Sequence, residues 1–259
     1  MENCGFVENI KAVFSEKLPG VKLFAYESAE STNTEAKLYA SGACEKTAFF
    51  VAESQSGGRG RKGRSFSSEK GGLYLSYSFA PSLKCTEAVK LTLFAAVALS
   101  ETVFEFTGIM PEIKWVNDVF LGGKKLAGIL AEGEFSANGD GFEYAVVGIG
   151  VNLWSRQFSG ELENIATDLE KETGIKVDIP AFALRLSERL MSFESVPCEE
   201  YTAKYRELFC ARGKNVTVKS ADGVYKAKAI DVLDDGSLLV ELPSGERRSL
   251  FSAEISIEI

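Results

Sequence analysis

A short loop combines glycine with positive charge in a way that indicates an anion-binding site. Residues 57–64 read Gly-Gly-Arg-Gly-Arg-Lys-Gly-Arg, so four cations fall within six positions. Glycines let backbone amides turn toward a bound group, and the planar guanidinium of arginine matches phosphate or carboxylate oxygens. A run of like charges is usually a solvated loop, but the interleaved glycines after a predicted strand favour binding. We therefore expect a nucleotide phosphate or an acyl phosphate as the ligand.

Two familiar phosphate-binding motifs fit this loop by spacing alone. Gly58, Gly60 and Gly63 match the dinucleotide fingerprint. Gly58 and Gly63 also have P-loop spacing, although Arg64 stands where a P-loop has lysine. Both motifs need a helix that begins at the end of the loop. Residues 65–72 are mostly serine, glycine and charged residues and predict no such helix. Neither a Rossmann site nor a Walker ATPase is expected.

Three further segments place polar groups or bare backbone at the ends of predicted strands. Asn117 and Asp118 follow a strand and suit magnesium on a phosphate, although an Asn-Asp pair alone is usually a turn. Lys125 leads into a strand in which Gly128 permits close ligand approach, and the plain alternative is an ordinary hairpin. Residues 148–152, Gly-Ile-Gly-Val-Asn, end a buried strand and are equally consistent with a β-bulge.

The composition excludes most common catalytic chemistries. The 259 residues include no histidine, which rules out Ser-His-Asp and Cys-His catalysis and histidine metal sites. A net charge of -8 opposes binding to nucleic-acid phosphates. The five cysteines are scattered without a CxxC pair, which favours a reducing compartment. No segment resembles a signal peptide or is apolar for long enough to cross a bilayer. We expect a cytoplasmic protein that binds neither nucleic acid nor membrane.

The elements predicted around these segments are those of an α+β protein. An N-terminal amphipathic helix precedes a strand at 22–27, and so few residues leave no room for a helix-turn-helix module. Residues 32–35 have the form of a capping box, which should begin a helix that ends near Gly42. Further strands are expected at 47–53, 73–79, 112–116, 126–135 and 142–152, and further helices at 86–107, 161–173, 180–195 and 199–210.

The pattern of the chain changes after Gly213. Residues 214–259 are short β runs separated by Asp-Gly and Ser-Gly turns. This pattern predicts a small barrel-like meander, which would be marginal alone and should pack against the rest of the chain. We therefore expect a larger domain at 1–212 and a small C-terminal β-barrel domain at 213–259.

Taken in this order, the segments resemble the biotin protein ligase family. The resemblance covers nearly the whole chain, and the arginine-glycine loop is its specific part. Val116 stands where the family has proline, and Ala253 where it usually has glycine, but neither position carries chemistry. The resemblance rests on Ser31-Thr32-Asn33, Gln55 with residues 58–64, residues 114–118, residues 125–130, residues 148–152 and Ala253-Glu254-Ile255-Ser256.

The resemblance implies both a fold and a reaction. The fold is a mixed, mostly antiparallel sheet backed by helices, like the catalytic domain of class II aminoacyl-tRNA synthetases, with the small β-barrel after it. Biotin reacts with MgATP to give biotinyl-5'-adenylate and pyrophosphate, and biotin then passes to a lysine of a biotin carboxyl carrier protein. No histidine is needed, because biotin's carboxylate is already ionised near pH 7. The missing N-terminal DNA-binding module implies a ligase without repressor activity.

The resemblance also assigns residues to biotin, nucleotide and magnesium. Arg61, Lys125 and Asp118 are the expected catalytic residues. Arg61 closes over the adenylate, Lys125 bridges the biotin carboxylate and the α-phosphate, and Asp118 holds magnesium. The expected nucleotide site is Arg61, Arg64, Phe66, Asn117, Lys125 and Asn152. The expected biotin site is Ser31, Thr32, Asn33, Gln55, Gly58, Arg59, Gly60, Arg61, Lys125, Gly128, Gly148 and Gly150.

Several expectations accompany this assignment. Gly128, Gly148 and Gly150 should let the fused rings of biotin lie near the backbone. ATP and magnesium are the expected cofactors, with no tightly held metal. Residues 57–65 should be mobile when empty and order over the adenylate, because a glycine-rich loop of like charges has little internal reason to be rigid.

Three alternatives stay open at this point. Lipoate ligases and acyltransferases on a related fold use an Arg-Arg, triple-glycine and histidine motif that this chain lacks. A protein that only senses biotinyl-adenylate would keep the basic loop, Lys125 and Asp118. Nucleic-acid binding ranks last. A homodimer through an exposed sheet edge is open as well, and so is a role for Asp118 in deprotonating the acceptor lysine.

Overall fold

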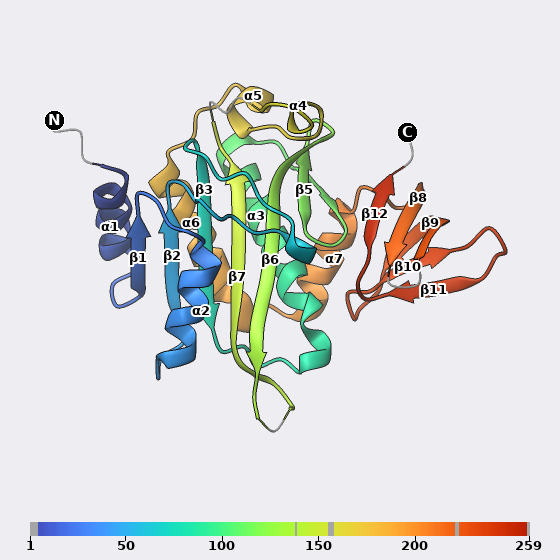
Figure 1. Ribbon diagram of the computed structural model, residues 1–259, viewed down its shortest axis with the longest axis horizontal. Coiled ribbons are helices and arrows are strands. Elements are labelled where there is room, and N and C mark those ends of the chain that lie inside the picture. Colours follow the sequence, from blue (N-terminus) through green and yellow to red (C-terminus); the bar gives the residue numbers. More distant parts are fainter. Residues whose placement is uncertain (1–4, 138, 155–157, 221–222, 258–259) are drawn as a thin grey trace.

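The computed structural model describes residues 5–137, 139–154, 158–220 and 223–257, which form a large mixed sheet, flanking helices and a second, smaller sheet (Figure 1). The strand order in the large sheet is β1-β2-β3-β7-β6-β5-β4. β1 and β2 are parallel, and the other neighbours are antiparallel. This arrangement confirms the predicted α+β fold. The strands are β1 Lys22–Tyr26, β2 Ala48–Ala52, β3 Gly72–Phe79, β4 Glu112–Lys114, β5 Asp118–Leu121, β6 Lys124–Phe135 and β7 Phe142–Asn152.

Helices cover the two faces of the large sheet (Figure 1). α2 lies over β2, β3 and β7, whereas α3 and α6 pack on the opposite face. α3 is mostly apolar and mostly buried, because the sheet, α6 and α7 enclose it. It ends at Gly108, whose φ of 71° suits glycine at a helix C-terminus. The helices are α1 Phe6–Lys17, α2 Thr32–Gly42, α3 Val89–Thr107, α4 Leu162–Ile165, α5 Leu169–Thr173, α6 Ile179–Met191 and α7 Cys198–Leu208.

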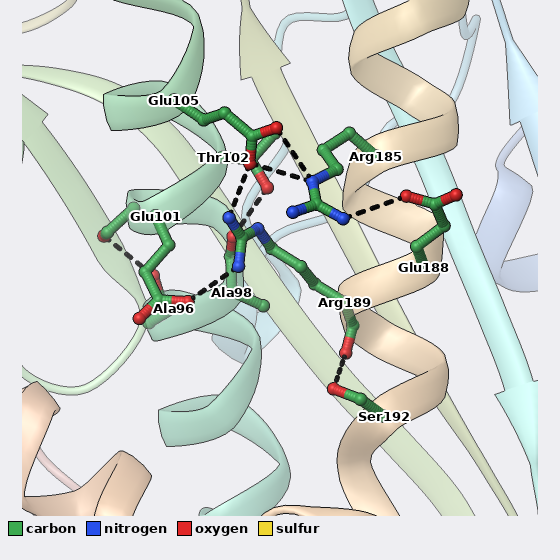
Figure 2. A network of polar contacts seen from close by, with 10 residues as sticks. Ala96, Ala98, Glu101, Thr102, Glu105, Arg185, Glu188, Arg189 and Ser192 are labelled. Carbon is green, nitrogen blue, oxygen red and sulfur yellow. Dashed lines mark hydrogen bonds and ion pairs between the residues drawn. The ribbon is translucent and has the colours of Figure 1, made fainter. Parts of the chain in front are cut away.

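Ion pairs connect α6 to α3 behind the sheet. Figure 2 shows Arg185 and Arg189 of α6 facing two glutamates of α3. Glu105 lies between both arginines, with Oε2 at 2.8 Å from Arg185 Nε and 2.7 Å from the Arg189 guanidinium. Glu101 completes the group at 3.0 Å from Arg189. Partly exposed pairs of this kind contribute little stability each, typically about 0.2–1 kcal/mol, so their main effect is to set how α6 lies on α3.

The predicted capping box at the start of α2 is wrong. The helix begins one residue earlier than a Thr32 cap implies, with Ser31 as the N-cap, and no side chain caps it. The Thr32 hydroxyl instead lies 3.2 Å from Gln55 Oε1 and 2.8 Å from Ser76 Oγ. The Thr32 hydroxyl therefore bonds residues that are distant in the sequence and does not cap the helix as the local pattern predicted.

Two other elements differ from the prediction. The expected strand at 112–116 ends at Lys114, and a tight turn leads directly into β5, which the sequence analysis missed. The single helix expected at 161–173 is two short helices, α4 and α5. Asp168 separates them, because its carboxylate caps α5 by accepting a hydrogen bond from the Lys171 amide at 2.9 Å.

The C-terminal residues form one antiparallel sheet in the order β11-β10-β9-β8-β12. Trp115 joins this sheet to the larger one, since its indole nitrogen donates to Gly236 O at 3.0 Å. Arg206 of α7 adds an ion pair with Asp234 at 2.8 Å. The small sheet thus packs on the rest of the chain, as predicted. Its strands are β8 Asn215–Ser220, β9 Gly223–Val232, β10 Leu238–Glu241, β11 Arg247–Leu250 and β12 Glu254–Ile257.

The helices within the described ranges fall short of what a bilayer-spanning segment requires. Not one of them combines the length and the apolar character needed to cross a membrane.

Candidate active site

A pocket lies where α2, the basic loop, the β4–β5 turn, strands β6 and β7 and the C-terminal sheet meet. The space between its lining residues is about 1040 Å³ when the part open to solvent is counted. Every predicted site residue lines it except Gly58 and Asn152. The structure therefore brings together segments that are far apart in the sequence.

The two predicted residues outside the lining have structural surroundings. Gly58 lies where a side chain would collide with Ser68 Oγ and Phe66 O, so glycine is needed for the loop to pack. Asn152 is buried and donates from Nδ2 to Thr167 O at 3.0 Å, which holds the link between α4 and α5. Neither observation tests the nucleotide or biotin roles predicted for them.

One end of the pocket is formed by Ser31, Thr32 and Gln55. Gln55 Oε1 accepts from the Thr32 amide at 2.8 Å, and Gln55 Nε2 donates to Ser68 Oγ at 2.9 Å. Ser68 in turn donates to Phe66 O at 2.9 Å. These bonds fix which side of the Gln55 carboxamide is the acceptor. We call Ser31, Thr32, Asn33 and Gln55 the α2 end of the pocket.

Asn33 lies in a network that the sequence analysis did not find. Its Nδ2 donates to Leu130 O at 3.2 Å and to Glu132 Oε2 at 2.9 Å, while Oδ1 accepts from Ser76 Oγ at 2.7 Å. Lys37 pairs with the other oxygen of Glu132 at 2.6 Å. Burial raises the pKa of the Glu132 carboxyl, but the hydrogen bonds from Lys37 and Asn33 and nearby positive charge outweigh it, so the pKa lies below its usual value.

Glycines open the face of β6 and β7 beneath α2. Gly148 pairs with Ser76 on β3 and with Leu130 on β6, so these three residues form one row across the sheet. A side chain at Gly148 would collide with the Asn33 carboxamide. At Gly150 it would meet the Phe66 ring. All three glycines at which biotin rings are expected, Gly128, Gly148 and Gly150, line the pocket, and the placement of the rings against them stays a prediction.

Lys125 and Asp118 form an ion pair in the middle of the pocket. Lys125 Nζ lies 2.7 Å from Asp118 Oδ1 and 5.8 Å from the centre of the Phe66 ring. Asp118 of β5 pairs with Gly128 of β6. The register between these two strands then shifts, so that Phe120 pairs with Lys125. The side chains of Lys125 and Asp118 are partly exposed to the pocket, so the ammonium and the carboxylate are each accessible to a ligand.

Arg61 extends from the basic loop toward the same centre. One of its guanidinium nitrogens donates to Asn117 Oδ1 at 3.2 Å. Burial lowers the pKa of Arg61, and the negative charge of Asp118 acts in the opposite direction. A half-buried cation whose hydrogen-bond acceptor is a neutral carboxamide is well placed to receive an anion.

The residues around Asp118 fit a magnesium ion that arrives with a nucleotide. Magnesium is commonly bound by one or two carboxylates together with phosphate oxygens and water. Asp118 offers one carboxylate, and the Asn117 carboxamide lies beside it in the pocket lining. Across the ranges that the structure describes, no group of three or more Asp, Glu, Cys or His side chains is arranged to hold a metal.

The other end of the pocket is formed by the basic loop and the C-terminal sheet. Arg64 forms an ion pair with Glu254 of β12, and Lys62 Nζ lies 3.8 Å from the same carboxylate. Arg59 approaches Glu30 at 3.9 Å. We call residues 59–64 and Glu254 the loop end of the pocket. Glu254 was named only as part of the resemblance, and its contact with the loop was not predicted from the sequence.

Comparison with known proteins bears directly on this pocket. Residues 25–152 match the Biotin/lipoate A/B protein ligase family, and residues 212–257 match the biotin protein ligase C terminal domain. The bifunctional ligase/repressor BirA of Bacillus subtilis is 30% identical over 245 residues, which cover 92% of this chain and 74% of that protein. This chain belongs to the biotin protein ligase family. The predicted resemblance is confirmed.

Other members of the biotin protein ligase family are similar over more of their length. The biotin--[acetyl-CoA-carboxylase] ligase of Paracoccus denitrificans is 32% identical over 235 residues, which cover 87% of this chain and 96% of that protein. The biotin protein ligase from Aquifex aeolicus, solved in complex with biotin and ATP, is 29% identical, with a TM-score of 0.75. The match covers 92% of this chain and 98% of that one.

Proposed function

We propose that this chain is a biotin protein ligase, which activates biotin with ATP and transfers it to a lysine of a biotin carboxyl carrier protein. The observation that carries the proposal is the pocket. It joins a buried, hydrogen-bonding end to a cationic end, with Lys125 and Asp118 between them. A neutral polar ring system fits the first end and an acyl phosphate fits the second.

In the first step, a carboxylate oxygen of biotin attacks the α-phosphorus of ATP. The bond from that phosphorus to the bridging oxygen breaks, and pyrophosphate leaves with the electron pair. Negative charge grows on the phosphate oxygens during this step. Lys125 and Arg61 stabilise it, because both are cations in a partly water-excluded pocket. Asp118 would hold magnesium, which would supply further charge neutralisation to the phosphates.

In the second step, the neutral amine of the carrier lysine attacks the carbonyl carbon of biotinyl-adenylate. A carbon-nitrogen bond forms, the bond to the phosphate oxygen breaks, and AMP leaves. The amine normally has a pKa of about 10.4, so it must lose a proton before it attacks. Asp118 is our candidate to accept that proton, since its carboxylate lines the pocket.

Finer points belong to the same proposal. The catalytic domain comprises residues 1–212 and the small β domain residues 213–259. Magnesium comes with ATP, and the protein works in the cytoplasm without binding nucleic acid or membrane. The net charge of -8 supports this choice of partners.

Pyrophosphate release from MgATP tests the proposal, with biotin, lipoate and octanoate supplied separately. A carrier domain is then added and its mass measured. We expect release with biotin alone, followed by the mass gain of one biotinyl group on the carrier. Biotin binding without release would instead make the chain a sensor, and release with lipoate alone would make it a lipoate ligase.

A further inference from the structure

Asn33 occupies a trough in the sheet that connects the pocket to the partly exposed carboxylate of Glu132. The trough exists because Gly148, in the middle of the row Ser76-Gly148-Leu130, has no side chain. The Asn33 carboxamide lies in it, with Ser76 at one end and Leu130 O at the other. Ser76 and Asn33 are almost completely buried, so the hydrogen bonds here are screened from water.

Glu132 determines how the Asn33 carboxamide is oriented. Its pKa is lowered, so the carboxylate is ionised at neutral pH and can only accept hydrogen bonds. One oxygen accepts from Lys37 and the other from Asn33 Nδ2. Both Nδ2 protons of Asn33 are then used, on Glu132 and on Leu130 O. The Oδ1 atom must therefore face Ser76.

The orientation of Asn33 affects Thr32 through the hydroxyl of Ser76. Ser76 has one hydroxyl proton, and it lies 2.7 Å from Asn33 Oδ1, which can only accept. Ser76 Oγ also donates to Thr32 Oγ1 at 2.8 Å, so Asn33 and Thr32 draw on the same hydroxyl. Thr32 therefore accepts from Ser76 and donates its own proton to Gln55 Oε1 at 3.2 Å. Gln55 Oε1 also accepts from the Thr32 amide at 2.8 Å.

We propose that Glu132 is a positioning residue that acts through Asn33 and Ser76 to hold the Thr32 hydroxyl in place, so that Thr32 offers the ligand a hydrogen-bond acceptor. The proposal rests on the proposed function. Thr32 lines the pocket, and with Ser76 donating to it and its own proton on Gln55, one lone pair of its hydroxyl remains for the ligand. A ureido N–H group is the donor that this arrangement selects. Glu132 thus contributes to specificity without touching the substrate.

The test compares biotin with its two cyclic carbamate analogues, in each of which one ureido N–H is replaced by oxygen. The readout is kcat/KM for pyrophosphate release by the full chain. A site built to accept an N–H should favour biotin over one of the carbamates by about a hundredfold or more. In Glu132→Met this preference should fall at least tenfold, because biotin loses activity while the carbamate changes little.

Matched variants separate positioning from a general loss of structure. Glu132→Gln retains an acceptor for Asn33 and should recover most of the preference. Lys37→Met removes the ion pair but leaves the Glu132 carboxylate facing Asn33, so it should also keep the preference. Glu134→Gln changes an exposed carboxylate two residues along the same strand and should have no effect. If Glu132→Met does not fold, Ser76→Ala breaks the same chain of bonds at its middle and should give the same loss of preference.

Three results would overturn the inference. Glu132→Met and Ser76→Ala could lower biotin and carbamate activity by one common factor, which would mean a merely structural role. The preference could survive unchanged in both variants. The unsubstituted chain could also turn over biotin without distinguishing it from either carbamate. Absence of any biotin-dependent pyrophosphate release by the unsubstituted chain would overturn the proposed function itself.

Discussion

The two ends of the pocket are built in different ways. At the α2 end, Ser31, Thr32 and Asn33 are 2%, 3% and 5% exposed, and hydrogen bonds within the protein hold the polar groups of Thr32 and Asn33. At the loop end, the side chains of Lys62 and Arg64 are 46% and 62% exposed. Their described ion pairs are both with Glu254 of the C-terminal sheet.

Under the proposed function, the difference follows from the kind of group that each end binds. A neutral ring system is distinguished only by the direction of its donors and acceptors, so its site must be fixed in advance. A phosphate is attracted by charge over a longer range, so cations on a flexible loop can serve and can close after the ligand arrives. Lys125 and Asp118 stand between the two ends, where we propose that the acyl phosphate forms.

Lys125→Ala should have the largest effect, because it removes the cation at the junction of the two ends. We expect adenylate formation to fall by about a hundred- to a thousandfold, with little change in ATP binding, since its main contact forms as charge builds in the transition state. Biotin-dependent pyrophosphate release and ATP titration measure the two quantities. The control is Lys124→Ala, whose ammonium bonds Glu163 O instead of lining the pocket. An unchanged rate in Lys125→Ala would remove its assigned role.

Gly148→Ala should damage the α2 end alone. The new methyl group collides with Asn33 Oδ1, so the Asn33 carboxamide must move. We expect kcat/KM for biotin to fall by about ten- to a hundredfold and the free energy of unfolding by about 1–3 kcal/mol. ATP binding should not change. Gly42→Ala is the matched control, because a side chain there meets nothing within 4 Å. Equal effects on biotin and ATP would contradict the separation of the two ends.

Glu254→Gln should weaken the loop end alone, and by less. Without the carboxylate charge, Arg64 and Lys62 lose their shared partner, so more ordering is needed when the nucleotide binds. We expect kcat/KM for ATP to fall by less than about tenfold, and the difference to shrink at high salt. Biotin binding without ATP should be unaffected. Glu246→Gln is the control, since that exposed glutamate of the small sheet pairs with Arg248 instead. A larger effect on biotin than on ATP would count against this account.

The pH dependence of the α2 end should be the smallest effect. The Glu132 pKa is lowered below its usual 4.5, so its stabilising contribution is complete above about pH 4.5 and is lost as the pH falls through the lowered value. The difference in unfolding free energy between the unsubstituted chain and Glu132→Gln should therefore be constant from pH 6 to 8 and decrease only in acid. Urea unfolding across this range measures it. A difference that varies between pH 6 and 8 would show that Glu132 is not held ionised.

The loop end was the easier part to predict from the sequence. Residues 57–64 can be recognised from the local sequence, because glycines and cations are interleaved within one short segment. Asp118 and Lys125 were also chosen, but their ion pair depends on the register between β5 and β6, and β5 itself was missed. A strand of four residues after a tight turn leaves almost no periodicity to detect.

The α2 end was only partly predictable. Thr32 was expected to cap its helix, which is a local role, but its hydroxyl instead forms hydrogen bonds with Ser76 of β3 and with Gln55. Glu132 alternates with apolar residues and looks like an ordinary surface position of a strand. Its role is visible only once α2 is packed over Gly148 and brings Asn33 and Lys37 within reach. Networks between distant segments leave no signal in the spacing of either segment.

Amide hydrogen exchange tests the contrast between the two ends most directly. The exchange of residues 57–65 and of residues 31–37 is compared in the free chain and with a non-hydrolysable analogue of biotinyl-adenylate. We predict a large gain of protection in the loop, which closes over the ligand, and little change at the start of α2, which is already fixed. Equal protection of the loop with and without the analogue, or a gain confined to residues 31–37, would contradict the account.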